Sequence, residues 1–207
     1  MQQAFLSGED FHTLTAAKVF HVSPEEVTPR MRSGAKAVNF GIVYGISAFS
    51  LAQDIGVSVA EAKEYMERYF DTYRGVKAYM EQVVETAHEQ GYVETLMHRR
   101  RELPELKSSN FNMRSFGERV ALNMPIQGTA ADLMKLAMVA VHRRLKAEGL
   151  RARLVLQVHD ELIVECPEAE AETAAKLLAE EMRGVAHLAV PLTAEAHWGR
   201  DWLEAKG

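Results

Sequence analysis

The spacing of apolar residues predicts that the first two thirds of the chain are mostly helical. Thr28-Pro29 is a strong helix start, because Thr is a good N-cap and Pro fits the first turn. This helix is expected to run to Tyr44, where Gly45 can end it. Ser58 and Glu61 form a capping box for the next helix. That helix is expected to continue through Ala60–Tyr73, and further helices are expected at Val76–Gln90, Ser115–Leu122, Gln127–Glu148 and Glu168–Arg183.

Short β-branched and apolar runs predict the strands. Leu154–Val158 and Leu162–Val164 are separated only by His159-Asp160-Glu161, and so short a connection indicates a hairpin. Helices first and antiparallel strands later predict an α+β fold, with a helical lobe beside a partial antiparallel sheet. The other strands are expected at Gly91–Leu96, at Arg101–Leu103, which can pair back with it, and around Val190–Ala196.

Composition places the chain among ordinary globular proteins. Its 207 residues are 47% hydrophobic and 26% charged, enough for one domain or two closely packed ones. Cys166 is the only cysteine, which excludes an intramolecular disulfide and favours a reducing compartment. Neither a bilayer-spanning run nor a signal-peptide pattern is found, so we expect a cytoplasmic protein.

The net charge of −5 argues weakly against a nucleic-acid-binding protein, because such proteins usually carry a basic surface. Local charge differs from this average, since Arg30, Arg32 and Lys36 cluster and Arg99–Arg101 form a second basic group. Each cluster could equally be a solvated surface face.

The helix that starts at Pro29 carries two cations and two aromatic residues at intervals of four. Arg32, Lys36, Phe40 and Tyr44 therefore form one stripe about 18 Å long, comparable to an extended nucleoside triphosphate. The cations lie in the N-terminal half, where the free N–H groups and the helix dipole already favour anions. The alternative is that both aromatic residues belong to the core and both cations lie at its rim. Gly34 and Gly41 inside this helix suggest a packing reason or close approach of another segment.

Two other segments carry candidate chemistry. Asp160 and Glu161 at the hairpin tip provide hard oxygen ligands suited to Mg²⁺, although a polar turn facing water explains them as well. Arg119, Asn123 and Gln127 are again four apart, and such side chains suit the acceptors of the DNA minor groove. Because Pro125 is expected to disturb the helix there, the amides could instead cap its broken ends.

Together these segments resemble the C-terminal part of the bacterial DNA polymerases of family A. Arg32–Gly45 matches the family pattern Arg-x₃-Lys-x₃-Phe/Tyr-x₃-Tyr-Gly, called motif B, and Gln157–Glu161 matches motif C. The resemblance covers essentially the whole chain. It implies a helical fingers subdomain at residues 1–100 and a partial palm subdomain at residues 101–207. Other matching segments are Gly91–Leu96, Lys107–Asn110, Asn123–Asp132 and Asp201-Trp202.

The resemblance also implies a role for each candidate residue. Arg32 and Lys36 would hold the incoming triphosphate, with help from His12. Phe40 would lie against the sugar and discriminate against one lacking its 3′-hydroxyl, and Tyr44 would stack near the templating position. The catalytic residues would be Lys36, Asp160 and Glu161, the last two as Mg²⁺ ligands, and the residues touching primer–template DNA would be Arg101, Arg119, Asn123, Gln127 and His159.

One family feature is missing from the sequence. The family's strand Asp-Tyr-Ser-Gln-Ile-Glu, whose Asp bridges both catalytic metal ions, occurs nowhere in the chain, and neither a thumb nor an exonuclease domain is recognised. Two-metal phosphoryl transfer needs carboxylates on both sides of the ions. We therefore expect the chain to be a truncated part of a DNA replication or repair polymerase, inactive by itself and holding no tightly bound metal.

Two readings remain beside a truncated polymerase. The chain could be a non-catalytic DNA-binding remnant, which an in-frame coding sequence for the missing strand would exclude, or a purely structural domain. The missing strand would also leave an unpaired sheet edge next to the hairpin, which dimerisation could cover. A smaller departure is Met97-His98, where family members often carry a glycine before the arginine pair.

Overall fold

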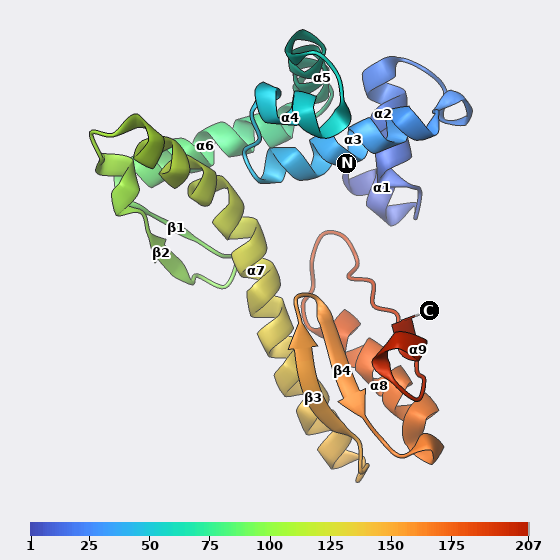
Figure 1. The fold of residues 1–207 in the computed structure, drawn as a ribbon. Coiled ribbons are helices and arrows are strands. Elements are labelled where there is room, and N and C mark those ends of the chain that lie inside the picture. The colour runs from blue at the N-terminus through green and yellow to red at the C-terminus, as the bar shows by residue number, and fades with distance from the viewer. Residues whose placement is uncertain (207) are drawn as a thin grey trace. The chain divides into compact units, whose positions relative to one another are not determined.

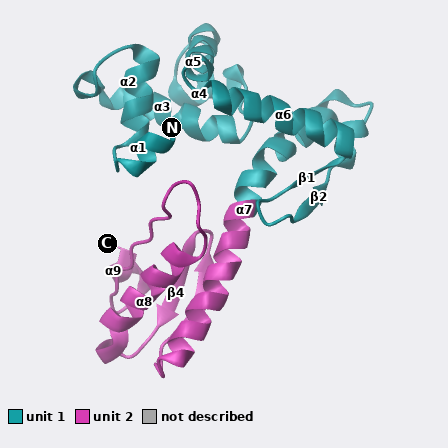
Figure 2. Ribbon diagram, turned by 180° about the vertical axis from the view of Figure 1, so that it is seen from behind, with its two compact units in different colours: residues 1–128 teal, residues 129–207 magenta. Residues whose placement is uncertain are grey.

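The computed structural model describes residues 1–206, and the chain divides into two compact units, residues 1–128 and 129–207 (Figures 1 and 2). Among the described residues the fold is mostly helical with two small antiparallel sheets, so the predicted α+β class is confirmed. The predicted division into polymerase subdomains at residue 100 is not tested by these compact units and stays a prediction.

Unit 1 is built from helices and one short hairpin. The hairpin strands pair with each other, as the sequence predicts, and their antiparallel register places Val93 opposite Arg101. Helices α2 and α4 and the short α1 are not predicted by the sequence pattern. The elements are α1 (Gln2–Leu6), α2 (Phe11–Phe20), α3 (Pro29–Val43), α4 (Ala48–Ile55), α5 (Val59–Thr72), α6 (Arg74–Gln90), β1 (Tyr92–Glu94) and β2 (Arg100–Glu102), with 3₁₀ turns at Pro24–Glu26 and Pro104–Lys107.

The predicted helix starts of α3 and α5 are confirmed in atomic detail. The hydroxyl of Thr28 accepts a hydrogen bond from the Met31 N–H, and Pro29 occupies the first turn. Ser58 and Glu61 form the full capping box, with the Glu61 carboxylate accepting from the Ser58 N–H at 2.8 Å. Such caps satisfy N–H groups that a helix leaves unpaired, so these local signals are readable from sequence.

Unit 1 contains two apolar clusters of buried residues. The first joins α2 to α6 and is centred on Leu51 and Ala62, which are fully buried. The second lies between the β1–β2 hairpin and the start of α7 (Phe111–Ala147), and it includes Val93, Leu103 and Ala121. These clusters fix the backbone of α3 and of the first part of α7.

The long helix α7 corrects the sequence expectation of two helices broken near Pro125. The structure has one helix from Phe111 to Ala147 with Pro125 inside it. Proline in a helix interior costs about 3 kcal/mol, because it lacks an N–H and crowds the preceding turn. Ala121 is fully buried just before the proline, and Met124 packs on the same cluster. Burial on this face outweighs the local cost.

Unit 2 consists of the rest of α7, a hairpin and two further helices. The hairpin strands are β3 (Arg153–Val158) and β4 (Glu161–Glu165), followed by a 3₁₀ turn at Glu168–Glu170, α8 (Ala171–Gly184) and α9 (Trp202–Lys206). Its buried cluster is formed by α7, the hairpin and α8, with Val141, Leu145 and Leu177 among its members.

Two details of unit 2 differ from the sequence prediction. Glu161 belongs to β4 and pairs with Val158, so the turn consists of His159 and Asp160 alone. The strand expected around Val190–Ala196 is wrong, because no strand is assigned there. Within the described chain, β3 and β4 pair only with each other, and the Ala194 carbonyl accepts a hydrogen bond from the Arg183 side chain at 2.9 Å. The Ala194 carbonyl therefore bonds to a side chain and not to a neighbouring strand.

Cys166 follows β4 and lies half-buried against the apolar cluster of unit 2. Burial raises the pKa of its thiol, so the reactive thiolate is scarce in the folded chain. In the described part of the chain, no helix has the length and apolar character needed to cross a membrane.

Candidate nucleotide- and duplex-binding surface

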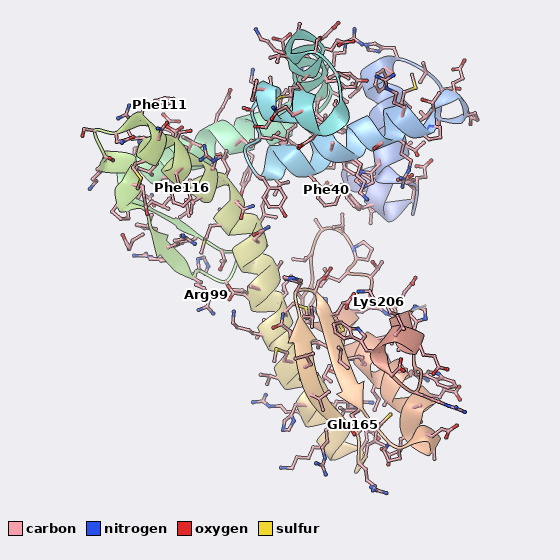
Figure 3. The ribbon with its side chains drawn as sticks, in the orientation of Figure 1. Phe40, Arg99, Phe111, Phe116, Glu165 and Lys206 are labelled. Atoms are coloured by element: carbon pink, nitrogen blue, oxygen red, sulfur yellow. The ribbon has the colours of Figure 1, made fainter. Side chains whose placement is uncertain are left out.

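The stripe on α3 faces solvent along its whole length. Arg32 and Lys36 are exposed, and Phe40 and Tyr44 keep 52% and 50% of their surface accessible. The ring of Phe40 projects from α3 in Figure 3. The reading in which both aromatic residues belong to the core is therefore wrong. The opposite face of α3 supplies the core instead, through Ala35, Val38 and Ile42.

Glycine is required at the C-terminal end of this stripe. A Cβ on Gly41 would lie 2.6 Å from Cγ2 of Ile46, so the chain after α3 folds back against the helix there. Gly45 has a φ of +65°, and a Cβ on it would lie 3.1 Å from Cγ of Arg119. Gly34 differs, because its nearest neighbour, Tyr65, would be at an ordinary 3.9 Å. Close approach is thus found at Gly41 and not at Gly34.

Arg32 is held by an acidic partner from the start of α2. Its Nε donates to the Asp10 carboxylate, which also accepts hydrogen bonds from the His12 N–H and the Thr13 hydroxyl. The hydrogen bond from Arg32 is the main reason that the pKa of Asp10 lies well below its usual range. The guanidinium is thereby oriented on the same surface as Lys36 and His12.

His12 lies beside the stripe. Its ring packs 5.7 Å from that of Phe40 between centroids, and its Nδ1 is 3.0 Å from the Asn39 amide nitrogen. Burial lowers the pKa of His12, the nearby charges of Arg32 and Lys36 lower it further, and Asp10 opposes them. Lys36 also approaches the Phe40 ring, with its Nζ 6.0 Å from the centroid.

A second surface of unit 1 lies where the end of α3 meets α7. The Gln127 amide donates to the Tyr44 hydroxyl at 2.9 Å. A cavity of about 660 Å³ opens beside this contact, and a second of about 470 Å³ lies along α3, with Tyr44 and Arg119 lining both. The larger cavity is lined by Tyr44, Arg99, Arg100, Arg101, Phe116, Arg119, Val120, Asn123, Met124, Gln127 and Gly128.

The amides on α7 do not cap a broken helix. Because α7 continues through Pro125, Asn123 lies in a helix interior with no terminus to satisfy. Its amide nitrogen is buried and has no hydrogen-bond partner among the described residues, while that of Gln127 donates to a side chain. The amide set therefore faces a cavity edged by arginines, which suits a ligand with both acceptors and negative charge.

The arginines of the basic group on the β1–β2 hairpin differ in their contacts. The Nε of Arg100 donates to the Glu94 carboxylate at 2.6 Å. The Cζ of Arg100 lies 4.4 Å from the centroid of the Tyr92 ring. Arg101 is exposed and lines the large cavity. In the connection between the strands, His98 has a φ of +60°, in the left-handed region that glycine favours. The backbone thus keeps a glycine-like conformation at Met97-His98.

The hairpin residues lie in unit 2. His159 and Asp160 form the exposed turn, where His159 has a φ of +53°. Glu161 is ion-paired with Lys206 of α9, with Nζ 3.1 Å from Oε1. Among the described residues, no group of three or more histidine, cysteine, aspartate or glutamate side chains could hold a metal ion. Asp160 and Glu161 therefore do not gather with a third such side chain among the described residues.

Two residues of this surface escaped the sequence analysis. Asp10 carries no local sequence signal for this role, because its hydrogen bond to Arg32 joins residues 22 apart. Asn39 is 8% exposed on the inner face of α3. A polar residue at an apolar position of the helical pattern was the available signal, since buried amides are normally hydrogen-bonded.

Comparison with known proteins gives the same family from sequence and from structure. The model of DNA polymerase family A matches residues 1–204. The chain is 54% identical over 206 residues to DNA polymerase I of Bacillus caldotenax, covering all of this chain and 24% of that protein. It is 53% identical over 204 residues to DNA polymerase I of Bacillus subtilis (strain 168), covering 99% of this chain and 23% of that protein. The chain thus spans about a quarter of the length of these curated relatives.

A solved structure also superposes on the whole chain. It is described as the POL domain of Pol1 from M. smegmatis in complex with DNA primer-template and dNTP. The TM-score is 0.93 with 46% sequence identity, covering 100% of this chain and 36% of that one.

Proposed function

The chain belongs to DNA polymerase family A, and on that premise we propose that it supplies the nucleotide-binding helix and a duplex-binding surface of a template-directed DNA polymerase. The observation that carries this proposal is the exposed stripe on α3, where two cations precede two half-exposed aromatic rings. Residues 1–100 would serve as fingers and residues 101–207 as part of the palm. The relatives are bacterial, so replication and repair synthesis is the process proposed.

Nucleotide binding is assigned to α3 and the start of α2. Arg32 and Lys36 would bind the triphosphate, because charge-assisted hydrogen bonds to phosphate oxygens are among the stronger polar contacts. His12 would add an uncharged contact beside them. Phe40 would lie against the sugar and disfavour one without a 3′-hydroxyl. Tyr44, held by Gln127, would stack near the templating base.

Primer–template binding is assigned to the large cavity of unit 1 and to the hairpin of unit 2. Arg101 would contact the DNA backbone, and Arg119, Asn123 and Gln127 would donate to minor-groove acceptors, which every base pair presents. His159 would touch the same primer–template DNA. Such contacts position a duplex without reading its sequence, which a polymerase needs.

The nucleotide assignment can be tested by calorimetric titration of the 207-residue chain with dATP. Arg32→Ala is expected to weaken binding about tenfold, the size of one lost hydrogen bond between charged groups. Arg30→Ala is the matched control, because Arg30 lies on the same helix outside the stripe. Equal affinities for both variants would remove the assignment.

The duplex assignment needs its own titration, using fluorescence anisotropy of a labelled primer–template. Asn123→Ala should weaken binding severalfold, whereas Asn112→Ala, at an exposed position of the same helix, should leave it unchanged. If neither Asn123→Ala nor Arg32→Ala alters any binding, the purely structural reading is favoured.

The 207-residue chain by itself is expected to show no primer extension with Mg²⁺ and the four dNTPs. Asp160 and Glu161 provide carboxylates on one side only, and the sequence contains no Asp-Tyr-Ser-Gln-Ile-Glu strand for the other. A full-length relative serves as the positive control. Template-dependent extension by the purified chain would disprove this expectation.

Dimerisation through the sheet edge beside the hairpin also stays a proposal. In the described chain β3 and β4 form a sheet of two strands, so hydrogen-bonding groups remain along the outer edges. Val155 and Leu156 of β3 are about half exposed, which adds apolar surface there. Sedimentation across a concentration series measures this, and a strictly monomeric chain would exclude it.

A further inference from the structure

The two ring nitrogens of His12 are in different environments. Nδ1 is 3.0 Å from the amide nitrogen of Asn39, a buried residue of α3. Nε2 makes no hydrogen bond to any other described residue, which leaves that nitrogen for a ligand. A neutral histidine carries a single N–H, so the partner of Nδ1 decides what Nε2 can do.

Asn39 belongs to a buried polar chain that fixes its orientation. The same amide nitrogen is 3.3 Å from the Thr15 hydroxyl, and Thr15, fully buried, lies 3.2 Å from the hydroxyl of Tyr73. An amide NH₂ has two hydrogens, and this arrangement uses one for His12 and one for Thr15.

The opposite amide orientation is less favourable. As placed, Asn39 leaves only its Oδ1 buried without a partner. Rotating the amide would bury an NH₂ group with both hydrogens unpaired, and buried unpaired N–H groups are rarer than under-satisfied carbonyls. The observed orientation therefore makes Asn39 a donor, and Nδ1 of His12 must accept.

We propose that Asn39 is a positioning residue that holds His12 in the tautomer protonated at Nε2, so that the ring presents an N–H donor to a phosphate oxygen beside Arg32 and Lys36. The phosphate ligand rests on the proposed nucleotide-binding function, whereas the tautomer does not depend on it. Phe11 and Phe40, with ring centroids 6.1 and 5.7 Å from that of His12, restrain the same ring by packing.

The charges around His12 agree with this role. Arg32 and Lys36 of α3 face the ring together with Asp10 of α2, and burial with the two cations lowers the pKa of His12 against the opposing effect of Asp10. The ring is therefore neutral near physiological pH, where the site of its single proton matters. A neutral donor extends the anion-binding surface without the repulsion that a third cation would face from Arg32 and Lys36.

Long-range ¹H–¹⁵N NMR of the 207-residue chain reads this tautomer directly. The His12 signals are assigned by their loss in His12→Gln. Wild-type chain above the pKa of His12 should show a protonated Nε2 and a bare Nδ1. A protonated Nδ1, or an even mixture of both tautomers, overturns the proposal without any need for a variant at Asn39.

Asn39→Asp tests the cause. A carboxylate of the same shape can only accept, so it should draw the proton to Nδ1 or stabilise the imidazolium, and the pKa of His12 should rise. Asn112→Asp adds the same charge at an exposed position of α7 and should leave the tautomer unchanged. A folded Asn39→Asp chain that keeps the wild-type tautomer contradicts the proposal.

Binding of a phosphate ligand is tested with inorganic tripolyphosphate. Its addition to wild-type chain should perturb Nε2 of His12 and leave Nδ1 bonded to Asn39, and Arg32→Ala should require about tenfold more ligand. If Arg32→Ala binds as wild type, the nucleotide-binding function fails while the tautomer result stands. If binding needs Arg32 but perturbs Nδ1 and not Nε2, the role of Asn39 fails alone.

Discussion

At the scale of single residues, Arg32 is already engaged before any ligand binds. Asp10 accepts a hydrogen bond from its Nε and also caps α2 through the His12 N–H. Both side chains remain substantially exposed, 46% for Arg32 and 40% for Asp10, so the pair is solvent-screened. An arriving triphosphate would exchange one anionic partner of Arg32 for another, which makes the net gain smaller than a free guanidinium would give.

The Asp10–Arg32 pair has a defined dependence on pH. Because the pKa of Asp10 is depressed below its ordinary value of 3.8, the stabilisation is complete above that value and is lost as pH falls through the lower folded pKa. Asp10→Asn keeps an oxygen to cap α2 and should cost no more than about 1 kcal/mol at neutral pH. Urea unfolding of both chains should show this difference shrinking in acid. A difference that grows in acid would contradict the assignment.

At the scale of elements, α3 is constrained on two sides. Its outer face carries the exposed stripe proposed to bind the nucleotide, and its C-terminal turn is covered by the chain that folds back at Ile46. The helix therefore gives up intrinsic stability at Gly41, where glycine is about 1 kcal/mol worse than alanine, to allow that contact. Glycine at position 34 lowers the stability of the helix in the same way, although no neighbouring atom lies close to it.

Alanine at these two glycines should act in opposite directions. Gly41→Ala places a Cβ 2.6 Å from the Ile46 side chain, and overpacking of this kind costs about 1–3 kcal/mol. Gly34→Ala meets only an ordinary contact with Tyr65 and should stabilise by up to about 1 kcal/mol. Chemical unfolding measures both, and Gly34→Ala is the matched control. A stabilising Gly41→Ala would show that Ile46 moves freely.

Elements that are fixed by local residues can be predicted from sequence, whereas those fixed by distant contacts cannot. The caps at Thr28 and Ser58 and the turn of the β3–β4 hairpin are local, so their residues are recognisable without knowing the fold. Continuation of α7 through Pro125 depends on burial of Ala121 against strands and turns distant in sequence. The stripe on α3 was predictable from its period, whereas the Asn39 hydrogen bond joins α3 to α2 and was not.

At the scale of the whole molecule, charge is unevenly distributed. The chain has a net charge of −5, yet four arginines line the large cavity of unit 1. Acidic residues are frequent in the 3₁₀ turn and helix at 168–181 of unit 2. A local basic surface can therefore bind a polyanion although the overall charge is negative, because exposed charges more than a Debye length apart, about 8–10 Å, are largely screened.

The affinity for primer–template DNA should consequently fall with salt, to an extent set by the few basic residues that contact phosphates. Counterion release predicts that log affinity falls linearly with log salt, with a slope set by the phosphates neutralised. Arg101→Ala should reduce this slope by about 1. Lys63→Ala removes a charge of the same sign from exposed α5 and should leave the slope unchanged. Identical slopes for all three chains would exclude Arg101 from the interface.

Cys166 gives the molecule a built-in kinetic reporter. It is the only thiol, it lies against the apolar cluster of unit 2, and burial suppresses its thiolate. A thiol-specific reagent should therefore modify the folded chain more slowly than the unfolded chain. Opening of unit 2 should raise this labelling rate, and a ligand that binds only unit 1 should lower the rate only if the two units open together.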